Sequence, residues 1–220
     1  MNNYSQLIFD NPLFSNIPPD HFPAVSDCMN SFTQTFQSRT LLFGAGSKIT
    51  RFGLLLKGTV EIFLLGSDGT HTLISLVSPG ELFCHSLAVA EAADHLFMIY
   101  ASEGSEILFL HVPKFTAAEN CHCACRYKVM ENLMKLIAKD NMNLTMKVQI
   151  LTQGSLREKL MLYFSFLAKE QHSNTILLPF GRDKLASYLF CNRSAVSREL
   201  GRMQKEGLLS IHKNEITLPA

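Results

Sequence analysis

The hydrophobic and polar positions divide the chain into three regions with different periodicities. In the first region, between Phe32 and Val112, short β-rich runs alternate with turn signals such as "SDG" at 67–69 and "SPG" at 78–80. Short strands at regular spacing are typical of an antiparallel sandwich or barrel, and Asp-Gly between two runs favours a hairpin. The predicted strands are Phe52–Leu56, Thr59–Leu65, His71–Val77, Leu96–Tyr100 and Ile107–His111.

The second region is a single long helix, predicted from about Ala124 to Leu151 because it contains no glycine or proline. Its apolar positions form two rows whose spacing alternates between four and three residues, which is the pattern of a coiled-coil seam. A helix packed only on its own sheet would need a similar stripe. The polar Asn141 inside the row favours a homodimer, in which paired asparagines set the register. The predicted dimer seam consists of Tyr127, Met130, Met134, Ile137, Asn141, Leu144, Val148 and Leu151.

The third region begins near Ser155 and is predicted to contain three helices and short strands. Leu156–Glu170 carries its apolar residues on one helical face, and "TILLPF" after it has the pattern of a small strand. Two helices follow, Arg182–Leu189 and a longer one that opens on Arg193, and two strand-like runs close the chain. A hairpin that follows two helices joined by a short turn indicates a winged helix-turn-helix.

The helix that opens on Arg193 has one apolar face and one small, polar, cationic face. Small residues allow a close approach to a groove, and an arginine can bind a phosphate or the O6/N7 edge of guanine. A surface helix that merely carries two arginines is the alternative interpretation. The combination of two helices, a short turn and a hairpin favours nucleic-acid binding. The predicted DNA-binding residues are Lys184, Asn192 (also suited to cap the helix), Arg193, Ser194, Ser197, Arg198 and Arg202.

The distribution of charge agrees with two separate tasks. The formal net charge of the chain is only +1, but residues 181–220 contain seven basic and four acidic side chains. The rest of the chain contains 13 basic and 15 acidic side chains. A basic tail on a mildly acidic body suggests that the two parts of the chain have different tasks.

At this point a resemblance is plain over nearly the whole chain. The stretches "GLLLKGTVEIFLLGSDGTHTLISLVSPGELF", "LREKLMLYF" and "LASYLFCNRSAVSRELGRMQKEGLL" resemble the effector domain, hinge-proximal helix and DNA-binding motif of the Crp/Fnr superfamily of bacterial transcription regulators. The resemblance implies an α+β fold with an N-terminal antiparallel β-roll (a double-stranded β-helix, jelly-roll-like). It also implies RNA polymerase as a partner. The expected domains are residues 1–123 for the roll, 124–152 for the dimerisation helix and 153–220 for the winged helix-turn-helix.

The chain departs from the cyclic-AMP-responsive members of that family. Where those members have a Gly-Glu pair that binds the ribose, this chain has Cys84 and His85. Where they have an Arg-Ser or Arg-Thr pair that clamps the phosphate, it has His95 and Leu96. A cyclic phosphate without a cation or an amide cradle would be poorly held. We therefore expect an effector other than cyclic AMP.

The expected effector site lies between the roll and the central helix. Because its side chains are mostly apolar or aromatic, a small apolar or aromatic effector is expected. The site residues are Phe83, Cys84, His85, Ser86, Met98 and Tyr100 from the roll, with Asn141, Leu144 and Thr145 from the helix.

The recognition motif has two departures of its own. Ser194 stands where many members have a glutamate that accepts from cytosine, so base preference at one position should differ, by about 1–3 kcal/mol. Phe190 stands where the turn often has glycine. Either Phe190 adopts a positive φ at a cost of about 1–2 kcal/mol, or the turn is reshaped and the ring packs inward.

The cysteine cluster "CHCAC" at 121–125 offers an alternative input. Redox or metal sensing through Cys121, Cys123 and Cys125, with His122 close by, would still control DNA binding. The favoured interpretation is a set of reduced thiols at the start of a helix, because zinc sites usually show two separated ligand pairs. Most of the six cysteines are expected to be reduced. No metal is expected.

Two further classes are disfavoured. A cupin-type metalloenzyme needs clustered histidines and a glutamate, but the histidines of the roll region are scattered singly, so no enzyme is expected. A secretory leader or membrane span is not apparent, and the densest apolar segment, Leu96–Ala101, is short. The sequence therefore predicts a cytoplasmic, effector-responsive homodimer that binds double-stranded DNA at a palindromic operator, without a membrane partner.

Overall fold

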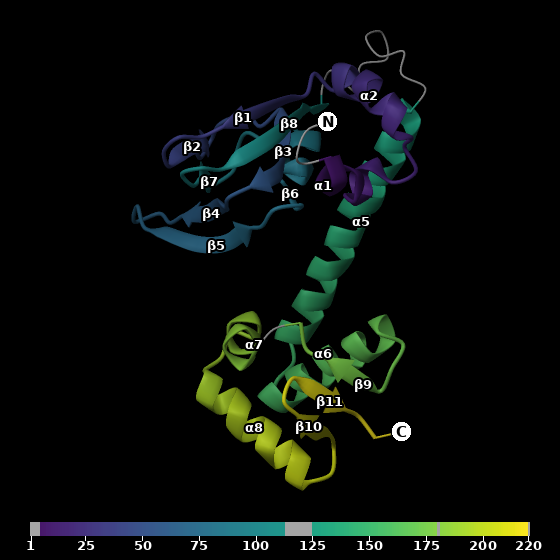
Figure 1. Cartoon of the computed structure of the whole chain (residues 1–220). Coiled ribbons are helices and arrows are strands. Elements are labelled where there is room, and N and C mark those ends of the chain that lie inside the picture. Colours follow the sequence, from purple (N-terminus) through teal and green to yellow (C-terminus); the bar gives the residue numbers. More distant parts are fainter. Residues whose placement is uncertain (1–4, 113–124, 180, 220) are drawn as a thin grey trace. The chain divides into compact units, whose positions relative to one another are not determined.

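The chain folds into two compact units, Met1–Lys139 and Asp140–Ala220, each with its own hydrophobic core. The structure is a computed structural model that describes residues 5–112, 125–179 and 181–219 (Figure 1). Within those ranges, no helix combines the length and the apolar character that crossing a bilayer requires.

The first unit is built on two four-stranded antiparallel sheets, as the alternating runs predict. Their strand orders are β1-β8-β3-β6 and β2-β7-β4-β5. The Asp-Gly turn is confirmed as a hairpin, because Leu65 pairs with His71 across it and Gly69 has a φ of 81°. The strands are β1 (Phe32–Thr35), β2 (Thr40–Phe43), β3 (Arg51–Lys57), β4 (Val60–Leu65), β5 (His71–Val77), β6 (Leu82–Phe83), β7 (Phe97–Ala101) and β8 (Glu106–His111).

The five predicted strands correspond to β3, β4, β5, β7 and β8, with ends that differ by one residue at most. The sequence pattern misses the other elements of this unit, most of which have only two to five residues and show too little periodicity. The remaining elements of this unit are α1 (Ser5–Phe9), the 3₁₀ turns η1 (Pro12–Phe14) and η2 (Pro19–His21), α2 (Phe22–Cys28), β1, β2, β6 and α3 (His85–Val89).

The roll closes tightly where β3 pairs with β6. Gly53 lies opposite Phe83 in this pair. A Cβ atom on Gly53 would stand 2.3 Å from the Phe83 ring and 2.9 Å from Ile107. Only glycine therefore allows the Phe83 ring to lie on β3, where it is buried in the core.

The long helix is confirmed as α5 (Arg126–Leu151), and its first half packs on the roll. Val129 and Leu133 are buried in the core of the first unit. The buried Asn132 donates its Nδ2 hydrogens to the carbonyl oxygens of Leu13 and Ser15, at 2.9 Å each. This side chain holds the N-terminal segment against the helix.

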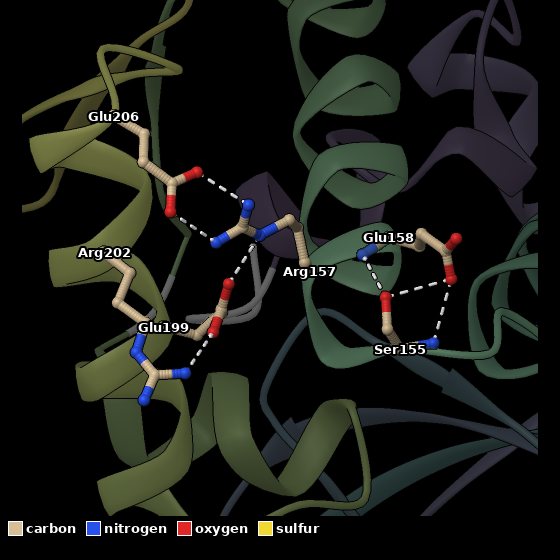
Figure 2. Close-up of polar contacts among 6 residues, drawn as sticks. All are labelled: Ser155, Arg157, Glu158, Glu199, Arg202 and Glu206. Carbon is tan, nitrogen blue, oxygen red and sulfur yellow. Dashed lines mark hydrogen bonds and ion pairs between the residues drawn. The ribbon is translucent and has the colours of Figure 1, made fainter.

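The second unit contains α6 (Leu156–Glu170), β9 (Thr175–Leu177), α7 (Arg182–Tyr188), α8 (Arg193–Lys205), β10 (Ser210–His212) and β11 (Glu215–Thr217). The closing hairpin is confirmed, and β9 joins it in a three-stranded sheet of order β10-β11-β9. Helix α6 begins with a capping box in which Ser155 and Glu158 satisfy each other's backbone N–H groups (Figure 2). The predicted α+β fold, a β-roll followed by a long helix and a winged helix-turn-helix, is therefore confirmed.

Candidate nucleic-acid interface

Helix α8 has the two faces that its sequence predicts. Val196, Leu200 and Met203 are at most 1% exposed and lie in the core of the second unit. The opposite face is open to solvent. It carries Arg193, Ser194, Arg198 and Arg202, all exposed, with Ser197 partly exposed.

Each arginine of the exposed face has a different electrostatic environment. Arg193 Nε lies 3.1 Å from Asp183 Oδ1, and both side chains are about 70% exposed to solvent. Arg202 Nη1 lies 3.7 Å from Glu199 Oε2. Among the described residues no carboxylate pairs with Arg198. Arg198 is therefore the cation of this face that is immediately available to an anionic ligand.

The start of α8 is held by backbone rather than by a side chain. Asn192 occupies the N-cap position, as expected, and its carbonyl accepts from the N–H groups of Ala195 and Val196. Its side chain makes no capping hydrogen bond. The exposed amide of Asn192 thus remains available for other contacts, as does the exposed Lys184 on α7.

The sequence allowed two forms of the turn between α7 and α8, one with a positive φ at Phe190 and one with its ring packed inward. The turn adopts the form with the positive φ. Phe190 has a φ of 53° and its side chain is 76% exposed, so the inward-packed alternative is wrong. The preceding Leu189 is fully buried and supplies the apolar anchor of the turn. The ammonium group of Lys147 on α5 lies 5.6 Å from the Phe190 ring and 5.1 Å from that of Tyr188. An outward ring at a left-handed position is unusual for a bulky residue.

An arginine of α6 binds two carboxylates at α8 and thereby restricts the orientation of that helix. Arg157 Nε donates to Glu199 at 2.6 Å, and its two terminal nitrogens donate to Glu206 at 2.7 and 3.0 Å. Figure 2 shows the guanidinium between the carboxylates of Glu199 on α8 and Glu206, the residue that follows α8. The hydrogen bonds to Glu206 and then Glu199 raise the pKa of Arg157, and the bond to Arg157 lowers the pKa of Glu206. Sequence reasoning missed this cluster because Arg157 lies more than 40 residues before both glutamates along the chain.

The predicted effector residues of the roll differ in burial. Phe83 and Cys84 are buried, and burial raises the pKa of the Cys84 thiol to about 12. Met98 and Tyr100 are half-buried, on the face of β7 opposite the buried Ile99. The Tyr100 ring lies 3.9 Å from the Arg39 guanidinium carbon. His85 is partly exposed, and Ser86 is exposed.

The helix residues predicted for the same site, Asn141, Leu144 and Thr145, are exposed and belong to the unit Asp140–Ala220. That they join the roll residues around an effector stays a prediction.

The position of the family's phosphate clamp is structural in this chain. His95 is 6% exposed, its Nε2 lies 2.9 Å from the Ser47 carbonyl oxygen, and its Nδ1 accepts from the Phe97 N–H at 3.3 Å. Both ring nitrogens of His95 are therefore engaged by backbone groups of the roll. The next residue, Leu96, has no polar side-chain atom and is 57% exposed. Neither residue supplies the guanidinium that the family's phosphate clamp uses.

The predicted seam of α5 divides into two parts. Met130 and Ile137 pack partly against the core of the roll, and Leu151 is also partly buried. The other apolar members are exposed by 58–78%, namely Tyr127, Met134, Leu144 and Val148, with Asn141 exposed among them. The helix therefore uses one edge of the stripe to hold its own roll and leaves the rest open.

The cysteine cluster lies mostly outside the described residues, which include only Cys125 of its three thiols and exclude His122. Within the described part of the chain no three potential metal ligands come together. Cys84, Cys125 and Cys191 are not in disulfides, whereas Cys28 is disulfide-bonded.

Comparison with known proteins agrees with both units. A model of the cyclic nucleotide-binding domain matches residues 33–119, and a model of the Crp-like helix-turn-helix domain matches residues 158–220. The anaerobic regulatory protein of Pasteurella multocida (strain Pm70) is 20% identical over 200 residues, covering 83% of this chain and 66% of that protein. The cAMP-activated global transcriptional regulator CRP of the same organism is 19% identical over 183 residues, covering 83% and 88%.

A solved structure shows the same fold along most of the chain. The catabolite activator protein of Thermus thermophilus aligns with a TM-score of 0.54 and 21% identity, covering 95% of this chain and 94% of that one. The two family models together with the cationic helix α8 settle the family. The chain belongs to the Crp/Fnr superfamily of transcription regulators, with a cyclic-nucleotide-type effector domain and a helix-turn-helix DNA-binding domain.

Proposed function

We propose that this regulator binds a palindromic operator as a homodimer and responds to an effector other than cyclic AMP. Helix α8 of each subunit enters the major groove, with the two helices about 34 Å apart, one turn of the duplex. RNA polymerase is the partner that the family implies. The observation that carries the proposal is the exposed cationic face of α8.

The composition of that face supports groove entry rather than a general surface role. The side chains between the arginines are small, since Ser194 and Ser197 flank Arg193 and Arg198. Short side chains let the helix backbone approach base edges, which long ones would prevent. Arg198, without an ion-pair partner among the described residues, keeps its five N–H donors for a guanine edge or a phosphate.

The open part of the α5 stripe supports the homodimer. Four large apolar side chains at seam spacing are more than half exposed in the single chain. Soluble monomers rarely leave such a contiguous apolar stripe in water. An exposed Asn141 in the same row suits an asparagine pair that sets the register of two identical helices.

The chemistry of the roll supports an apolar effector. No arginine occurs between Arg51 and Arg126, and the clamp position holds the structural His95. Lys48 already pairs with Glu91, at 2.5 Å. The proposed ligand is a small apolar or aromatic molecule bound near Phe83, Cys84 and His85. Thermal melting with cyclic AMP should show no rise.

Charge reversal of Arg198 tests the DNA-binding role. The probe is a duplex selected by the protein from a random-sequence pool, and affinity is measured by fluorescence anisotropy at two salt concentrations. Arg198→Glu should weaken binding at least tenfold, because it removes a base or phosphate contact and adds repulsion. The control is Lys169→Glu, which makes the same charge change at an exposed position in the last turn of α6.

The two variants separate a local from a general effect of charge. Loss of affinity in Arg198→Glu with little change in Lys169→Glu supports the proposed face. Equal affinity of Arg198→Glu and the parent protein would remove the basis of the proposal.

A further inference from the structure

A histidine and a cysteine from distant parts of the chain meet at the start of α5. His21 ends η2, and Cys125 immediately precedes α5, 104 residues later. Their side chains are in contact, with Nδ1 of His21 3.1 Å from Sγ of Cys125. An imidazole in hydrogen-bond contact with a thiol can take its proton and leave a thiolate, which is the nucleophilic form.

The backbone around Cys125 favours the same ionised form. Its carbonyl oxygen accepts from the N–H groups of Lys128 and Val129, at 3.0 Å each, so Cys125 sits at the N-terminal end of a 26-residue helix. The positive end of a helix stabilises an adjacent anion. The exposed carboxylate of Asp20 lies 3.9 Å from His21 Nε2, where solvent screens the interaction.

The pair is also reachable from solvent. The His21 side chain is 48% exposed, and Cys125 is partly exposed. The other two described thiols that are outside disulfides differ in this respect. Burial raises the pKa of Cys84 and, as the largest cause, that of Cys191. Cys84 and Cys191 therefore serve as internal references for the reactivity of Cys125.

We propose that Cys125 is a modification site, a thiol activated by His21 that reduces hydroperoxides. The thiolate sulfur attacks one peroxide oxygen, the O–O bond breaks and an S–O bond forms. The alkoxide that leaves takes the proton from the His21 ring and departs as an alcohol. The sulfur loses two electrons and becomes a sulfenic acid, while the hydroperoxide gains them.

The sulfenic acid would form beside α5, the helix that carries the proposed dimer seam. Its formation does not depend on DNA binding. Cys125 lies two residues before the exposed Tyr127, where the apolar stripe of α5 begins. A sulfenic acid there removes the thiolate that pairs with His21 at the first turn of the helix. The modification can be measured whether or not the operator proposal holds.

Competitive alkylation of the intact chain tests the activation. The folded protein is treated briefly with light iodoacetamide, then unfolded, reduced and treated with heavy reagent. Fragment spectra assign the label ratio to each cysteine separately. The variant is His21→Gln, which keeps a polar side chain but cannot take the proton, and the matched control is His71→Gln on exposed β5. A parallel sample receives tert-butyl hydroperoxide and then dimedone, which traps sulfenic acid.

We expect Cys125 to react faster than Cys191 in the parent protein, and Cys84 to react only after unfolding. His21→Gln should slow alkylation of Cys125 about threefold, since part of the gain in thiolate is offset by lower nucleophilicity. The dimedone adduct on Cys125 should fall with it, and His71→Gln should leave both unchanged. If Cys125 in the parent protein reacts no faster than Cys191, or if His21→Gln folds and reacts as the parent does, the proposal is overturned.

Discussion

Arg157 Nε lies 2.6 Å from Oε1 of Glu199, and this contact connects α6 to the cationic helix α8. The Glu199 side chain is only 15% exposed, so the bond is shielded from water on one side. Together with the two bonds to the C-cap residue Glu206, it holds α8 at two points about two turns apart. These contacts restrict the orientation of α8 and therefore that of its cationic face.

The ion pair between Arg157 and Glu206 predicts that the stability of the fold depends on pH. The bond to Arg157 lowers the pKa of Glu206 below its ordinary value of 4.5. A carboxylate with a lowered pKa contributes stability that is fully present above the ordinary value and is lost as pH falls through the lowered one. Glu206→Gln should therefore reduce the melting temperature at pH 7, by about 2 °C for an exposed pair.

The difference between Glu206→Gln and the parent protein should shrink as the pH falls through the lowered pKa of Glu206, because the parent then loses the same charge. Differential scanning calorimetry over a series of pH values from 7 into the acid range measures it. Glu215→Gln, an exposed change in the wing without an ion pair among the described residues, serves as control. A difference that grows toward acid would contradict the assignment.

The strained turn predicts a stabilising substitution. Phe190→Gly should raise the free energy of unfolding, by about 0.5–1 kcal/mol, because relief of the left-handed strain exceeds the added backbone entropy. Phe190→Ala removes the same exposed ring but keeps the Cβ atom. Urea unfolding of both variants separates the effect of φ from that of the ring. Equal stabilities would show that φ at this position carries no strain.

The pair of Arg193 and Asp183 predicts a gain in DNA affinity. Asp183→Asn removes a carboxylate that competes with phosphate for Arg193, and binding to the selected duplex should tighten about twofold to fivefold. The gain should decline as salt rises, since the exposed charge is screened. Glu170→Gln on exposed α6 makes the same charge change at a distance along the chain. A similar gain in both variants would indicate net charge rather than the pair.

The open stripe of α5 predicts the effect of a charge on assembly. Leu144→Glu should convert the dimer to a monomer in sedimentation velocity, because it places an anion in the proposed apolar seam. Met142, 72% exposed on the same helix but off the seam, provides the control Met142→Glu. The control should remain dimeric. A dimeric Leu144→Glu protein would place the subunit contact elsewhere.

Local periodicity accounts for much of what the sequence predicted correctly. The buried faces of α6 and α8 follow a period of 3.6, and the strands β3 to β5 follow turn signals. Burial in these elements depends on neighbours a few residues away, so the pattern is visible in the chain alone. The assignment of Arg193 and Arg198 to an exposed face follows for the same reason.

Other features arise only when distant segments meet. Nothing near Arg157 in the sequence indicates Glu199 or Glu206, and nothing near Cys125 indicates His21. The seam pattern of α5 likewise could not separate Met130 and Ile137, which pack on the roll, from the exposed Leu144, because all obey one spacing.

The sequence by itself determined the order of the elements, the faces of the helices and the family, since each depends on local spacing and residue type. Tertiary structure alone decided the ion-pair support of α8, the left-handed Phe190 and the contact between His21 and Cys125. These depend on packing between segments separated by tens of residues, and the physical cause is that side-chain contacts form across space while periodicity acts along the chain.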